Sequence, residues 1–154
     1  MGSVENRLAE LGLTLPEVVA PVASYVPAVA SGSLVFTAGQ LPMVAGVLPA
    51  TGHVGAEVTA EDARHYASIC ALNGLAAVKS VIGDLDRIVQ VVKVVGFVSS
   101  APDFTGQPAV VNGASDLLRD VLGDRGVHAR SSVGVAALPL NAPVEVELIV
   151  EFRA

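Results

Sequence analysis

The most regular hydrophobic pattern of the chain lies near its C-terminal end, between Ala129 and Phe152. Apolar residues alternate there with polar or small ones, and this two-residue period predicts two β-strands joined by a proline-marked turn. A simple hairpin would place Arg130, at the start of the first strand, opposite Glu151. In the second strand one face is apolar and the other is acidic. The apolar face carries Val144, Val146, Leu148, Val150 and Phe152, and the acidic face carries Glu145, Glu147 and Glu151.

Helical and strand periodicity extends over the rest of the chain. Thr59–Ile82 has the strongest helical pattern, with a capping motif at its start and Gly83 after its end. A β-branched run within Asp84–Ser100 is typical of a central strand. Shorter patterns predict a helix at 4–11, strands of a hairpin at about 26–30 and 34–38, a loop with a short strand at 43–58, and a helix at 105–122. This order predicts an α+β fold with a mixed sheet and two helices on one face.

Composition restricts the classes of function. The 154 residues carry a formal net charge of −6 without a basic run, which argues against nucleic acid as the natural partner. Charged residues interrupt every long apolar stretch, so we expect no membrane span, which needs roughly 18 apolar residues. An apolar signal sequence is missing, and Cys70 is the single cysteine, so we expect a cytoplasmic protein without a disulfide. We expect one domain over residues 1–154, with 1–20 as an N-terminal extension.

Three residues with reactive side chains have structural as well as functional interpretations. Cys70 lies on the apolar stripe of the first long helix, which favours a core role because a reactive thiol needs an electropositive setting. His53 lies in the glycine- and proline-rich 43–58 loop without a second ligand spaced nearby, so we expect no metal site. His128 precedes Arg130 by two residues; a catalytic role is open, and a structural role is favoured.

Two motifs carry a resemblance to a known family. From Ala129 onward the chain has an Ala-Arg-Ser start, a Val-x-Val strand, a Leu-Pro turn and a Glu-x-Glu strand. Upstream, LVFTAGQLP at Leu34–Pro42 is a strand that runs into a Gly-Gln-hydrophobic-Pro corner. With these motifs the chain resembles the Rid family (reactive intermediate deaminases), also called the YjgF or L-PSP endoribonuclease family. The resemblance implies a chorismate-mutase-like fold, in which the sheets of three subunits form a central barrel and helices cover the outside.

The same resemblance implies a site for a small carboxylate-bearing molecule at the subunit interfaces of a homotrimer. Arg130 would bind the carboxylate, and Glu145 would position or deprotonate the attacking water. The implied reaction is that of a 2-iminobutanoate/2-iminopropanoate deaminase, which hydrolyses reactive enamines and imines to 2-keto acids and ammonia without a cofactor. The substrate-binding residues that the resemblance adds are Tyr25, Gly39, Asn112 and Ser132.

Alternatives remain for these residues and for the function. Structural interpretations are also open for two residues. Arg130 fits a role as the partner of a structural ion pair with the acidic strand, and Asn112 fits a role as an ordinary surface amide of a helix. Ala38 stands where the family often has a hydroxyl residue, Ser132 replaces a common cysteine, and the 43–58 loop is longer than in short members. Two other functions therefore stay open: a non-catalytic carboxylate-binding or regulatory trimer, and a pathway-specific hydrolase with a different substrate.

Overall fold

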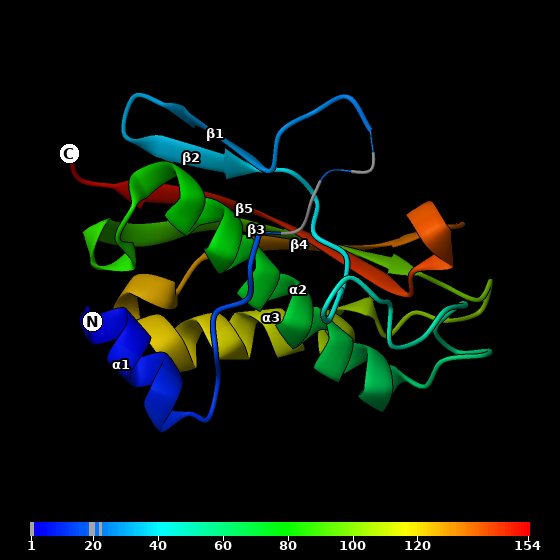
Figure 1. Ribbon diagram of the computed structural model, residues 1–154. Coiled ribbons are helices and arrows are strands. Elements are labelled where there is room, and N and C mark those ends of the chain that lie inside the picture. The colour runs from blue at the N-terminus through cyan, green and yellow to red at the C-terminus, as the bar shows by residue number, and fades with distance from the viewer. Residues whose placement is uncertain (1, 19–20, 22) are drawn as a thin grey trace.

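A mixed sheet of five strands organises the fold (Figure 1). The computed structural model describes residues 2–18, 21 and 23–154. In the sheet the strands lie in the order β1-β2-β5-β3-β4. Neighbouring strands are antiparallel except β3 and β4, which are parallel because a helix carries the chain from one to the other. The strands are β1 (Ala28–Ser31), β2 (Leu34–Thr37), β3 (Ile88–Ser99), β4 (Ala129–Val135) and β5 (Val144–Phe152).

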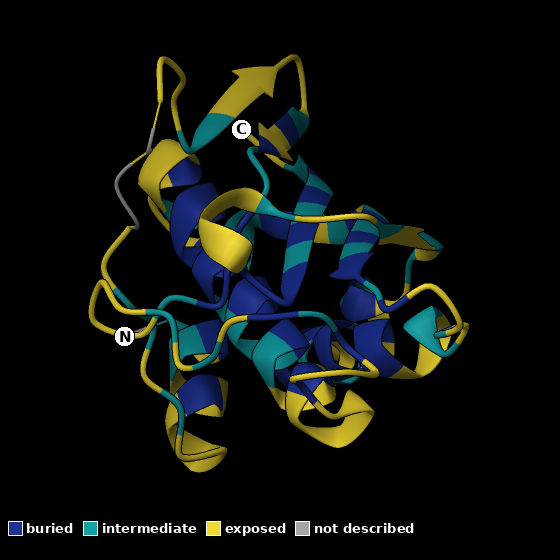
Figure 2. Cartoon of the chain, turned by 90° about the vertical axis from the view of Figure 1, so that its right-hand side faces the viewer, coloured by how far each residue is buried: buried dark blue, intermediate teal, exposed yellow. Residues whose placement is uncertain are grey.

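Two long helices, α2 (Ala60–Ile82) and α3 (Gln107–Leu122), cover one face of this sheet (Figure 1). Their apolar stripes pack on the sheet residues that face them. Figure 2 shows these sheet and helix residues as buried. On β3 and β5 the buried residues are Val91, Val94, Val98, Val144, Val146, Leu148 and Val150. The predicted α+β fold with two helices on one face is therefore confirmed, and a shorter helix, α1 (Ser3–Glu10), packs beside them.

The ends of α2 follow from local sequence. Thr59 Oγ1 accepts a hydrogen bond from the Asp62 N–H at 3.1 Å, as the capping motif predicts. Gly83 ends the helix with a φ of 82°, a conformation that favours glycine. Within α3, a Cβ on Gly113 would collide with the Arg64 carbonyl of α2. A glycine at this crossing lets the two helices approach closely.

The last two strands do not form a simple hairpin. β5 lies between β2 and β3, and among the described strands β4 pairs with β3 alone, at the edge of the sheet. Consequently Arg130 lies beside Val94 and Glu151 beside Leu34 and Gln90. The burial patterns fit these positions: β5 has no exposed residue, as expected for a strand with neighbours on both edges. β4 is rich in serine and glycine and only partly buried, which suits an edge.

The short strand predicted within residues 43–58 is wrong. This segment forms only isolated bridges, Val44 with Val47 and Val54 with Val58 and Ser100. Three of its glycines have positive φ, at Gly46, Gly52 and Gly55 in the described chain. Because these conformations turn the backbone, the apolar residues between them cannot form a continuous extended run.

Hydrogen bonds to the carboxylate of Asp86, which is far from α1 in the sequence, attach this helix to the rest of the domain. Asp86 Oδ atoms accept hydrogen bonds from the Ser3 N–H at 2.7 Å, the Val4 N–H at 2.8 Å and the Ser3 hydroxyl at 2.9 Å. These bonds lower the pKa of the Asp86 carboxyl. Val4 and Leu8 of α1 are buried in the core. The N-terminal segment thus contributes to the core, and Asp86 supplies the cap that Gly2 lacks.

The second face of the sheet is not covered by helices. Glu145, Phe97 and Val133 stand side by side on this open face, on β5, β3 and β4. Large apolar side chains remain accessible there, including Phe36 at 41% and Val133 at 43% exposure. None of the helices in the described part of the chain is both long and apolar enough to cross a membrane.

Candidate active site

Arg130 projects from the edge strand β4 onto α3. Its Nη1 donates to Asn112 Oδ1 at 2.8 Å and to Ser115 Oγ at 3.1 Å, and its Nη2 donates to the Pro108 carbonyl at 3.2 Å. A guanidinium has five N–H donors, so the Nε–H and one Nη2–H remain without an acceptor among the described residues. Arg130 is therefore held in position by neutral groups while two donors remain for a ligand such as a carboxylate.

A histidine supports this arginine through a serine. His128 Nδ1 lies 2.6 Å from the Gly126 carbonyl, so Nδ1 must carry the proton that makes this hydrogen bond. In the neutral ring Nε2 is then an acceptor, and it receives the Ser115 hydroxyl at 2.8 Å. Ser115 Oγ in turn accepts from Arg130. Burial lowers the pKa of His128, and the Arg130 charge acts in the same direction, against the hydrogen bond to Gly126.

Glu145 lies in a different setting, on the open face beside the corner after β2. Burial raises the pKa of its carboxyl, and the neighbouring Glu147 carboxylate raises it further. A Cβ on Gly39 would overlap the Glu145 carboxylate, so the glycine lets this side chain lie against the backbone of the corner. The backbone pairs Gln40 with Val146, which brings this corner beside the start of β5. The Gly39 amide donates no hydrogen bond within the described chain.

The predicted site residues thus form two groups. Arg130 and Asn112 are in contact on the helix-covered side of the sheet, and Gly39 and Glu145 are adjacent on the open face. Ser132 lies two residues after Arg130 on the same side of β4, and its buried hydroxyl has no hydrogen-bond partner among the described residues. Tyr25 is 46% exposed in the segment before β1.

Two polar contacts of Arg130 were not predicted from the sequence. Ser115 and the Pro108 carbonyl both hold the guanidinium. Ser115 follows Asn112 by three positions, a spacing that puts both side chains on one face of a helix. The sequence therefore contained the information needed to predict Ser115. Nothing in the sequence pointed to the carbonyl of Pro108. Ser115 and Arg130 also line a cavity of about 220 Å³, together with His128, Asp116 and Arg119.

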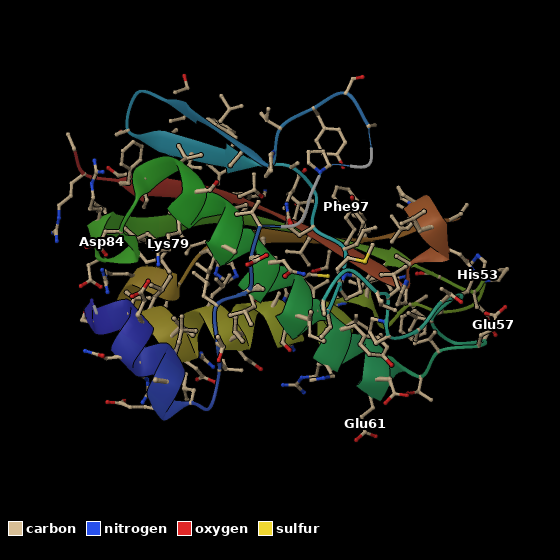
Figure 3. All side chains as sticks on the ribbon, viewed as in Figure 1. His53, Glu57, Glu61, Lys79, Asp84 and Phe97 are labelled. Carbon is tan, nitrogen blue, oxygen red and sulfur yellow. The ribbon has the colours of Figure 1, made fainter. Side chains whose placement is uncertain are left out.

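Other reactive side chains have structural surroundings. Cys70 is fully buried, and burial raises the pKa of its thiol, which confirms a core position. His53 Nε2 lies 2.7 Å from the Ala136 carbonyl, so the histidine links the 43–58 loop to the end of β4. Figure 3 shows His53 and Glu57 at the end of the molecule opposite to Lys79. Among the described residues, no three histidine, cysteine or acidic side chains are grouped to hold a metal ion.

Comparison with known proteins identifies the family of this chain. A family profile described as "YjgF/chorismate_mutase-like, putative endoribonuclease" matches residues 5–152. The chain belongs to the YjgF family. Protein TCP17 of Trypanosoma cruzi is 45% identical over 153 residues, covering 99% of this chain and 96% of that protein. The family resemblance inferred from the two motifs is confirmed.

Solved structures of related chains have the same fold. The crystal structure of Atu1372 from Agrobacterium tumefaciens, a protein of unknown function, is 49% identical, with a TM-score of 0.92 over 98% of this chain and 93% of that one. The crystal structure of Escherichia coli TdcF with bound serine is 26% identical, with a TM-score of 0.60 over 90% of this chain and 93% of that one. The chain therefore has the YjgF fold along almost its whole length.

Proposed function

We propose that this YjgF-family protein is an imine deaminase whose active site forms between subunits of a homotrimer. The observation that carries the proposal is the orientation of the Arg130 guanidinium. Three neutral acceptors hold it in place, and two of its N–H donors have no acceptor among the described residues. The bound serine of TdcF, a relative, is a small molecule with a carboxylate, the group that such donors bind. The ligand class is accordingly a small 2-amino-acid-like carboxylate.

Glu145 provides the complementary chemistry. A carboxyl with a raised pKa is a better general base near neutral pH than an ordinary glutamate. Water adds to the carbon of the substrate C=N bond while Glu145 takes its proton; return of protons to nitrogen releases ammonia and leaves the 2-keto acid. The Gly39 amide lies beside Glu145 and provides a further donor to the substrate.

The two groups of residues favour an assembly of several subunits. Arg130 and Glu145 lie on opposite sides of the sheet of one chain, so one substrate meets both only when they come from different chains. The open face with Phe36 and Val133 supplies an apolar surface for this contact. This arrangement supports the trimer with sites between subunits that the family resemblance implies.

A second function is supported by the same arginine. A trimer that binds small carboxylates without turnover needs Arg130 and Asn112 but not Glu145. An endoribonuclease, as the family description has it, is disfavoured by the net charge of −6, since RNA binding relies on basic residues.

The decisive experiment measures ammonia and 2-keto acid released from 2-aminoacrylate generated in situ. We expect turnover by the wild type and none above the uncatalysed rate by Arg130→Ala, with circular dichroism as the control for folding. Wild-type protein that is folded and trimeric but inactive would contradict the deaminase, and a carboxylate-binding measurement would then test the binder. Equal turnover by Arg130→Ala would contradict the role of Arg130.

A further inference from the structure

The hydroxyl of Ser115 has a different kind of partner from those of two serines on α2. Ser68 and Ser80 donate to carbonyls of their own helix three residues earlier, at 2.6 Å and 2.7 Å, a common arrangement for helix serines. The Ser115 hydroxyl lies instead 2.8 Å from His128 Nε2, just before β4. This hydrogen bond therefore connects α3 with the segment that leads to Arg130.

His128 fixes the direction of the Ser115 hydroxyl hydrogen. Its Nδ1 binds the Gly126 carbonyl, which can only accept, so in the neutral ring Nε2 is the acceptor for Ser115. With its hydrogen directed to His128, Ser115 Oγ offers its lone pairs to the Arg130 guanidinium, which can only donate. Without this partner the rotamer of Ser115 is no longer fixed, because a helix serine can also bind to carbonyls of its own helix.

The turn that orients His128 is itself packed on the fold. A Cβ on Gly126 would collide with the Leu118 carbonyl, so this turn lies directly on the backbone of α3. The Gly126 carbonyl, which binds the imidazole, cannot move without disturbing that contact. A series of hydrogen bonds thus runs from the backbone of a packed turn through His128 and Ser115 to Arg130.

The second side chain that holds Arg130 has less support. Asn112 Oδ1 accepts from Nη1 at 2.8 Å, but Asn112 is exposed and its side chain makes no other hydrogen bond within the described chain. Exposed side chains change rotamer rapidly. Ser115 is half-buried and hydrogen-bonded to both His128 and Arg130, so it holds Nη1 in place more firmly than Asn112 does.

We propose that Ser115 and His128 are positioning residues for the carboxylate of the ligand. They hold the Arg130 guanidinium in the orientation that binds the carboxylate, and neither of them contacts the ligand. The inference rests on the proposed function in taking Arg130 as the carboxylate-binding residue. It gives His128 a role in ligand binding, and it predicts that loss of the Ser115 hydroxyl weakens binding without removing a ligand contact.

Two substitutions of equal shape test the inference. Ser115→Thr keeps the hydroxyl, whereas Ser115→Val has a methyl group in its place, and both introduce a β-branched side chain into the helix. The cavity of about 220 Å³ beside Ser115 leaves room for the added methyl group in both variants. The measured quantity is the Kd of pyruvate, a 2-keto acid, from an NMR titration of the Arg130 Nε–H signal. This signal is assigned by its absence from Arg130→Lys.

We expect Ser115→Thr to bind pyruvate within about threefold of the wild type. Ser115→Val binds it about tenfold more weakly, since an acceptor for a charged donor is lost. In turnover of 2-aminoacrylate the same loss raises KM and leaves kcat nearly unchanged. Ser68→Val is the matched control, because Ser68 is also a half-buried helix serine and its hydroxyl binds the His65 carbonyl. Its Kd changes by less than about twofold.

A double-mutant cycle tests whether His128 acts through Ser115. His128→Phe keeps a planar ring without a nitrogen acceptor, and alone it weakens pyruvate binding by about fivefold. In the Ser115→Val background the same substitution changes the Kd by less than about twofold, because the residue that it acts on is already lost.

Equal affinities of Ser115→Thr and Ser115→Val would overturn the inference, and so would a full effect of His128→Phe in the Ser115→Val background. Absence of pyruvate binding by the wild type would overturn it together with the carboxylate role of Arg130. Failure of the deaminase alone looks different. The dissociation constants then follow the expected order, while 2-aminoacrylate is hydrolysed no faster than without protein.

Discussion

The side chains of Arg130 and Glu145 point to opposite faces of the same β-sheet. Arg130 lies beside the buried Val94 and reaches α3, whereas Glu145 lies beside Phe97 on the open face. Because β3 lies between their strands and they point to opposite faces, a change of side-chain rotamer does not bring Arg130 and Glu145 together within one chain. Their joint action on one substrate therefore requires a second subunit.

Mixed trimers of two inactive variants test this requirement. Arg130→Ala and Glu145→Gln each lose turnover when expressed alone. Coexpression forms sites that take Arg130 from one chain and Glu145 from another, and random mixing restores roughly a quarter of the wild-type activity per site. Imine hydrolysis by the tagged, copurified mixture is the measurement. Absence of recovery in trimers shown by mass spectrometry to be mixed would contradict a shared site.

The buried hydroxyl of Ser132 reduces stability. Its Oγ has no hydrogen-bond partner among the described residues, and an unsatisfied buried polar group costs free energy. We expect Ser132→Ala to raise the free energy of unfolding by about 1 kcal/mol in urea titrations. Ser131→Ala, on the opposite side of β4, is the control and changes it by less than about 0.5 kcal/mol. A marked loss of stability in Ser132→Ala would show that the hydroxyl has a partner.

His128 makes stability depend on pH. Burial holds the pKa of this histidine below the ordinary value of 6.5, so the folded protein binds fewer protons than the unfolded chain below that pH. The free energy of unfolding therefore falls as the pH drops below about 6.5, toward the folded pKa. Urea titrations between neutral pH and pH 5 measure this slope, and His128→Gln reduces it. His65→Gln, at an exposed position of α2, is the control; an equal reduction there would refute the assignment.

Asp86 stabilises α1 as a cap supplied from outside the helix. Asp86→Ala removes the acceptor for the Ser3 and Val4 amides and lowers the free energy of unfolding by about 1 kcal/mol. Hydrogen exchange of the α1 amides rises as well, whereas that of the sheet stays unchanged. The exposed Asp103→Ala serves as the control. Unchanged exchange of α1 in Asp86→Ala would mean that Val4 and Leu8 hold the helix without the cap.

The pH range of the Asp86 contribution follows from its lowered pKa. A carboxylate with a folded pKa below its ordinary value stabilises the protein above that ordinary value, and this stabilisation is lost as the pH falls through the folded pKa. The difference between wild type and Asp86→Ala should therefore be complete at neutral pH and disappear in acid. The same urea titrations, repeated below pH 4, measure this change.

Local sequence determined the secondary structure and the membership of the family. The capping pair Thr59 and Asp62, the glycine at 83 and the alternating residues of β5 act over a few positions, so their effects are visible without the fold. The motif around Arg130 likewise identified the guanidinium, and the asparagine on α3 was matched to it by the family resemblance. These features depend on neighbours along the chain, which the sequence contains explicitly.

Tertiary structure alone decided the order of the strands and the direction of each site residue. The pairing of β5 with β2 joins residues more than a hundred positions apart, and its free energy depends on burying both edges of β5. The turn at Pro139–Asn141 suits a hairpin equally well, so the sequence left the order of these strands open. The contact of Arg130 with Ser115 and the separation from Glu145 both follow from this non-local choice.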